Sequence, residues 1–136
     1  MKNNKVILDT NLWISFLISK RLGQIDKLIK ERKVTLIFSI ESIEEFIEVA
    51  DRPKFEKYFS KKDIDELLDR FDQYGELNLV RSNVQICRDK KDNFLLNLAI
   101  DSKADYLVTG DDDLLILEKI KDTKIMTFRN FIEHLE

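Results

Sequence analysis

The sequence predicts an α/β fold, a three-layer sandwich in which a central, mostly parallel sheet of about five short strands is flanked by helices. Short apolar runs alternate along the chain with longer segments of helical spacing, and this alternation is typical of a parallel sheet covered on both faces. The chain has 136 residues, which is the usual length of one domain. We therefore expect residues 1–136 to form a single domain.

Each of the first two predicted strands leads directly into a helix. The apolar run at residues 5–8 ends at Asp9, whose side chain can cap the nearly all-apolar helix that follows. The run at residues 34–38 is followed by Ser39 and Ser42, and either serine can cap the next helix. The remaining strands are expected at residues 77–80, 106–108 and 124–128.

The predicted helices follow from the spacing of apolar residues and from the residues at their ends. Pro53 disfavours helical geometry at the residue before it, so the third helix must stop ahead of this proline. Ser60 is a suitable cap for the fourth helix, and Gly75 is a suitable end. The predicted helices are residues 12–18, 25–33, 42–50, 60–75, 89–103, 114–120 and 130–135.

Composition and charge limit the kinds of protein that the chain can be. It is 43% hydrophobic and 36% charged, as expected for a soluble, folded protein. Its 23 basic and 26 acidic residues give a net charge of −3, which argues against avid, nonspecific binding of nucleic acid. The single cysteine, Cys87, cannot form an internal disulfide, which favours a cytoplasmic location. The longest uncharged run, residues 10–19, is too short to span a membrane.

Four acidic residues fall where a predicted strand has just ended or a helix is starting, and they are Asp9, Glu45, Asp92 and Asp111. Ligands of open α/β sheets bind outside the carboxyl ends of the strands, so we expect these carboxylates to converge at one edge of the sheet. Carboxylate oxygens are the ligands that Mg²⁺ and Mn²⁺ prefer. One or two such ions can orient a phosphodiester and activate a water molecule, so the residues favour a metal-dependent phosphodiester hydrolase.

The same residues also have structural explanations. Asp9 and Asp111 are suitable helix caps, and Glu45 can complete a capping box with Ser42. Asp89 is a suitable cap for its predicted helix, and Asp92 lies three residues after this cap. The metal hypothesis therefore depends on these side chains meeting at one place.

Three blocks of the sequence resemble the PIN-domain family, and more narrowly the VapC-like ribonucleases that are toxin components of bacterial toxin–antitoxin systems. The blocks are residues 6–11 (VILDTN), residues 45–55 (EFIEVADRPKF), and residues 88–93 with 104–115 (RDKKDN and ADYLVTGDDDLL). The resemblance implies a PIN-like fold and a Mg²⁺- or Mn²⁺-dependent endoribonuclease. It also implies an RNA substrate, a homodimer and inhibition by a cognate antitoxin protein.

The resemblance assigns roles to individual residues of this chain. The four acids of the family match Asp9, Glu45, Asp92 and Asp111. Its polar residues beside the metal match Thr10, Asn11 and Thr109. Asp113 matches a further acid, which binds the metal through water or assists its neighbour. Among the three nearby glutamates, Glu45 is preferred because it precedes Arg52 by seven residues, as in the family pattern.

Two groups of basic residues are candidates for contact with nucleic acid. The residues proposed for the rim of the site are Arg88, Lys90, Lys91 and Lys54. The second group lies in residues 54–62, where lysines alternate with Phe55, Tyr58 and Phe59. These aromatic rings either stack on bases or pack in the core.

Two other functions fit parts of the pattern. A receiver module also places Asp residues at strand ends and binds Mg²⁺, but it needs a lysine after a late strand, where this chain has Arg129 and Asn130. A PIN-like domain used only for binding gains nothing from four acids that repel one another. Catalysis by a Ser-His-Asp arrangement is disfavoured because the only histidine, His134, lies at the extreme C-terminus.

Overall fold

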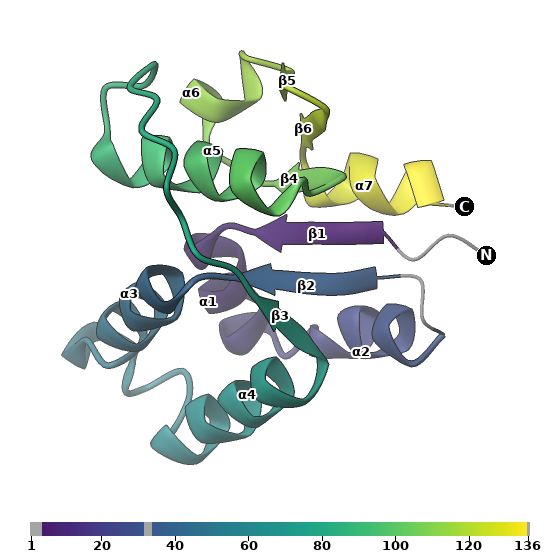
Figure 1. The fold of residues 1–136 in the computed structure, drawn as a ribbon. Coiled ribbons are helices and arrows are strands. Elements are labelled where there is room, and N and C mark those ends of the chain that lie inside the picture. The colour runs from purple at the N-terminus through teal and green to yellow at the C-terminus, as the bar shows by residue number, and fades with distance from the viewer. Residues whose placement is uncertain (1–3, 32–33, 136) are drawn as a thin grey trace.

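The computed structural model describes residues 4–31 and 34–135. Its centre is a six-stranded sheet with the strand order β3-β2-β1-β4-β6-β5 (Figure 1). Neighbouring strands are parallel, except that β5 runs antiparallel to β6. The strands are β1 (Asn4–Leu8), β2 (Val34–Phe38), β3 (Gly75–Leu77), β4 (Tyr106–Val108), β5 (Lys119–Ile120) and β6 (Thr123–Met126).

Helices cover both faces of the sheet, which confirms the predicted three-layer α/β fold. They are α1 (Thr10–Ser19), α2 (Leu22–Lys30), α3 (Ile40–Ala50), the 3₁₀ helix η1 (Pro53–Phe55), α4 (Lys61–Tyr74), α5 (Lys90–Ser102), α6 (Asp112–Leu115) and α7 (Phe128–Leu135). Val6 and Leu8 pack with α1, α2, α3, α4 and α7, whereas Ile7 packs on the other face with α5 and α6. Among the described residues, no helix is both long and apolar enough to cross a membrane.

Strand β3 starts at Gly75, two residues before the predicted strand at residues 77–80. Helix α4 runs directly into this strand, and Gly75 pairs with Leu36 of β2. A Cβ atom on Gly75 would lie 2.4 Å from the carbonyl oxygen of Phe71 and 2.9 Å from the ring of Phe38. Because glycine has no Cβ atom, the backbone at the start of β3 can lie this close to Phe71 and Phe38.

The helix predicted at residues 114–120 is wrong beyond Leu115. Helix α6 ends at Leu115, and the chain then turns into the short hairpin of β5 and β6. Glu118 and Lys121 have φ angles of 63° and 51°, which are left-handed conformations that a right-handed helix cannot contain. The other predicted elements are present with ends shifted by at most three residues, although residues 32 and 33 lie outside the described part of the chain.

The segment of residues 78–89 forms neither helix nor strand, and side chains of α5 hold it in place. The Asn97 amide accepts a hydrogen bond from the Val84 N–H at 2.8 Å and donates one to the Val84 carbonyl at 3.5 Å. The Asn93 amide makes the same pair of bonds with Cys87, at 2.7 and 2.9 Å. These bonds satisfy backbone groups that have no strand beside them.

Candidate metal centre

A cleft of about 250 Å³ lies at the edge of the sheet where β1 and β4 end. In Figure 1 this edge is the side toward which the arrows of β1 and β2 point. The cleft brings together residues from the β1–α1 junction, from α3, from α5 and from the loop after β4. Those predicted from the sequence are Asp9, Thr10, Asn11, Glu45, Asp92 and Asp111, together with Lys91 of the proposed basic rim.

Asp9 both caps α1 and faces the cleft. One carboxylate oxygen accepts a hydrogen bond from the Asn11 N–H at 3.3 Å, and the other accepts from the Thr109 hydroxyl at 2.8 Å. The side chain is only 8% exposed. Burial raises the pKa of Asp9, and the bond from Thr109 partly opposes this rise. Thr109 itself is completely buried, so it acts by orienting Asp9 rather than by lining the cleft.

Glu45 is free to face the cleft because two serines complete the cap of α3. The Ser39 hydroxyl accepts from the Ser42 N–H at 3.0 Å, and the Ser42 hydroxyl accepts from the Ser39 N–H at 2.9 Å. The alternative in which Ser42 caps this helix with the help of Glu45 is therefore wrong. Instead, Glu45 accepts a hydrogen bond from the Thr10 hydroxyl at 3.3 Å and forms an ion pair with Lys91 at 3.6 Å.

Three aspartates form a group of acids at the cleft, of which Asp92 and Asp111 line it and Asp113 does not. Asp92, Asp111 and Asp113 each offer a carboxylate oxygen, and these oxygens lie within 4.8 Å of one another. Asp92 is 5% exposed, and its Oδ2 atom has no hydrogen-bond partner among the described residues. Burial, followed by the charge of Asp111, raises the pKa of Asp92 to about 7. A buried oxygen without a partner, beside two further carboxylates, is the arrangement that a divalent cation stabilises.

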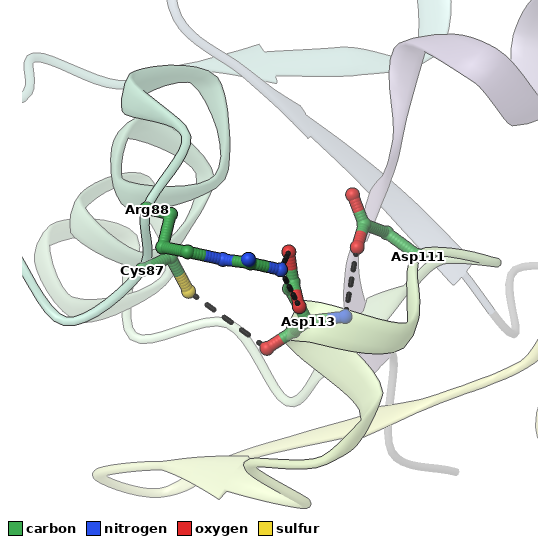
Figure 2. Close-up of polar contacts among 4 residues, drawn as sticks. All are labelled: Cys87, Arg88, Asp111 and Asp113. Atoms are coloured by element: carbon green, nitrogen blue, oxygen red, sulfur yellow. Dashed lines mark hydrogen bonds and ion pairs between the residues drawn. The ribbon is translucent and has the colours of Figure 1, made fainter.

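Asp111 and Asp113 are held by the first turn of α6 and by Arg88. Asp111 caps α6 by accepting from the Asp113 N–H at 2.8 Å, and its own N–H donates to the Thr109 hydroxyl at 3.0 Å. Figure 2 shows the Arg88 side chain extending toward the Asp113 carboxylate, whose two oxygens both lie 3.3 Å from one guanidinium nitrogen. Arg88 is exposed, so this contact is open to water.

The other basic residues proposed for the rim lie in different places. Lys91 lines the cleft, as described above. Lys90 lines a separate hollow beneath the segment of residues 78–89, and the Lys54 ammonium lies 5.1 Å from the ring of Phe55. Neither is among the residues that line the cleft.

Sequence reasoning missed two charged lining residues, Arg52 and Asp89. Arg52 follows Glu45 by seven residues, which is two helical turns, so the shared face of α3 and its C-terminus could have indicated it. The sequence predicts Asp89 only as the cap of α5. It does cap this helix, by accepting from the Lys91 N–H at 2.9 Å, and it lines the cleft as well.

Comparisons with known proteins show which family the chain resembles. The family model of the PIN domain matches residues 5–113 of the chain. An uncharacterized protein of Methanocaldococcus jannaschii is 34% identical over 143 residues, which cover 97% of this chain and 92% of that relative. The matched range 5–113 includes every residue that lines the cleft.

Proposed function

Because the chain belongs to the PIN domain family, whose members are metal-dependent nucleases, we propose that it is an endoribonuclease that uses Mg²⁺ or Mn²⁺. One observation carries the proposal: four carboxylates that are far apart in the sequence line a single cleft. The proposed metal ligands are Asp9, Glu45, Asp92 and Asp111, with Asp113 in support. This set offers only carboxylate oxygens, the donors that hard divalent cations prefer.

The residues around the cleft prepare it for a phosphodiester. A bound divalent ion supplies a Lewis acid that polarises a phosphate oxygen and lowers the pKa of a water molecule. Thr109 fixes the orientation of Asp9, and Thr10 does the same for Glu45. Lys91, which Glu45 holds at 3.6 Å, adds a positive charge on the side of the cleft formed by α5. Hydrolysis there needs no side-chain nucleophile.

The finer assignment that we propose is the toxin of a toxin–antitoxin pair. It rests on the sequence resemblance described above, which also suggests a homodimer, a cognate antitoxin and a cytoplasmic location. Induced expression of the unaltered chain in bacteria should arrest growth, whereas expression of Asp9→Asn should not. Normal growth with the unaltered chain would argue for an RNA-processing nuclease or for a PIN domain that only binds.

The central test of the nuclease function is Asp9→Asn. Asparagine caps a helix as well as aspartate does, so α1 should remain intact while a metal ligand is lost. Cleavage of structured and single-stranded RNAs would be measured with Mn²⁺ and Mg²⁺, beside the exposed control Asp65→Asn on α4. We expect Asp9→Asn to lose metal-dependent cleavage and Asp65→Asn to keep it. Equal cleavage by Asp9→Asn and the parent would show that the assigned site is wrong.

A further inference from the structure

A basic and aromatic segment, residues 52–62, follows α3 and differs sharply in charge from the rest of the chain. It contains five basic residues and one acidic residue, whereas the whole chain has a net charge of −3. The five basic residues are all exposed, and they are Arg52, Lys54, Lys57, Lys61 and Lys62. The local positive charge therefore faces solvent on a protein that is acidic overall.

The segment has a fixed conformation rather than that of a loose loop. The Phe55 N–H donates to the Arg52 carbonyl at 3.0 Å, and the Tyr58 N–H donates to the Phe55 carbonyl at 2.9 Å. Phe55 stacks on the buried ring of Phe59, with ring centroids 5.6 Å apart and an interplanar angle of 20°. Phe59 thus anchors the turn in the core.

Two pairs of lysine and aromatic residues repeat along this turn at a spacing of three residues. The Lys54 ammonium lies 5.1 Å from the centre of the Phe55 ring, and the Lys57 ammonium lies 5.2 Å from the centre of the Tyr58 ring. Lys54 lies in η1, and Lys57 lies in the turn that follows it. Neither lysine forms an ion pair with any of residues 4–31 or 34–135. Tyr58 is 44% exposed, unlike the buried Phe59.

The segment begins at the candidate metal centre. Arg52 lines the cleft, and Tyr58 follows it by six residues, which limits their separation to about 20 Å even for an extended chain. In Figure 1 the chain between α3 and α4 lies on the side toward which the arrows of β1 and β2 point. A strand of nucleic acid that enters the cleft can therefore continue along this segment.

We propose that residues 52–62 bind the single-stranded part of an RNA substrate next to the cleft. A base stacks on the exposed ring of Tyr58, while Lys54 and Lys57 contact the phosphates on either side of it. The choice of RNA as the ligand rests on the proposed nuclease function. The alternation of cations with an exposed ring favours a nucleic-acid strand over an acidic protein, because only the strand repeats a phosphate and a flat base.

Fluorescence anisotropy tests this surface without any cleavage. The probe is an unstructured, labelled RNA of about 12 nucleotides, with EDTA present. Tyr58→Leu should weaken binding about ten-fold. The double variant Lys54→Gln/Lys57→Gln should weaken binding and reduce the slope of log affinity against log salt by about 1.4, which corresponds to two lost phosphate contacts.

Matched variants elsewhere on the chain provide the controls. Tyr74→Leu removes a tyrosine that is 38% exposed at the end of α4, and Lys27→Gln/Lys30→Gln removes two exposed lysines with the same spacing on α2. Both should bind RNA as the parent does. Equal binding by Tyr58→Leu and the parent would overturn the proposal, and so would parent binding that favours duplex RNA or anionic phospholipid vesicles over the single strand.

A separate measurement keeps this proposal distinct from the nuclease function. Hydrolysis of bis(p-nitrophenyl) phosphate by the unaltered chain with Mn²⁺ reports on the metal centre, because this diester has one phosphate and no strand that could continue along residues 52–62. If the unaltered chain hydrolyses no diester and Tyr58→Leu binds RNA more weakly than the parent, the nuclease function is contradicted and the binding surface is supported. If the unaltered chain hydrolyses the diester and Tyr58→Leu binds RNA as tightly as the parent, the nuclease function is supported and the binding surface is contradicted.

Discussion

Asp92 is the carboxylate whose replacement should change the stability of the protein most informatively. The substitution Asp92→Asn keeps the shape of the side chain and removes its charge. It also provides an amide N–H that can donate to Asp111, whose carboxylate lies within 4.8 Å in the cluster. In the absence of metal, we therefore expect the substitution to stabilise the folded protein.

The size of this effect follows from the pKa of Asp92. Its value rises from 3.8 to about 7, and a difference of roughly three pKa units corresponds to about 4 kcal/mol against the ionised folded state. Asp111 and Asp113 are only partly buried, so water screens some of the repulsion, and we expect about half of this amount, ~2 kcal/mol.

The sign of the pH dependence is fixed by the direction of the shift. Between the unfolded value of 3.8 and the folded value of about 7, the folded protein binds more protons than the unfolded chain, so this carboxyl lowers stability as pH rises through that range. The penalty is complete above about pH 7 and nearly absent below about pH 4. Asp92→Asn should therefore be more stable than the parent by ~2 kcal/mol at pH 8 and by only ~0.5 kcal/mol at pH 4.5.

Urea unfolding with EDTA at the two pH values measures both numbers. The exposed substitution Asp65→Asn on α4 removes the same charge outside the cleft and should change stability by less than ~0.5 kcal/mol at either pH. If Asp92→Asn is no more stable than the parent at pH 8, burial and the charge of Asp111 do not disfavour the ionised form of Asp92 in the folded protein. A gain of equal size at both pH values would point instead to better packing.

Three further predictions concern the cation, the residue behind Asp9 and the start of β3. Mn²⁺ at about 100 times its dissociation constant should stabilise the parent by ~2.7 kcal/mol in thermal unfolding, and no shift at any concentration would contradict a preformed site. Thr109→Val removes the 2.8 Å hydrogen bond to Asp9, so it should lower the free energy of unfolding by ~1–3 kcal/mol. Because this bond lowers the pKa of Asp9, its loss should also move the acid limb of the cleavage rate to higher pH. Thr109→Ser keeps the hydroxyl and should show neither effect. Gly75→Ala places a Cβ 2.4 Å from a carbonyl oxygen and should lower stability by ~1–3 kcal/mol in urea unfolding, whereas Gly23→Ala, which has open space, should not.

The parts of the fold that the sequence predicted well are those governed by local pattern and topology. Short apolar runs and helix caps identified β1, β2 and β4, together with the helices that follow β1 and β2. Parallel strands end at the same edge of a sheet, so Asp9 and Asp111 could be expected to meet although 102 positions separate them. The convergence required no knowledge of side-chain contacts.

The parts that the sequence could not predict depend on contacts between distant residues. The β5–β6 hairpin needs left-handed conformations at Glu118 and Lys121, and neither is a residue type that signals them. The start of β3 depends on the approach of Gly75 to the ring of Phe38 on a neighbouring strand.

Helix α5 explains how a segment without regular structure can form part of the candidate site. Its first turn places Asp92 in the cleft, while Asn93 and Asn97 bind the backbone of residues 78–89 through paired hydrogen bonds. That segment in turn carries Arg88 to the Asp113 carboxylate. Because the same helix fixes both Asp92 and the backbone that presents Arg88, their relative positions are set by one rigid element. The asparagines that face away from the cleft therefore belong to its construction as much as the acids that line it.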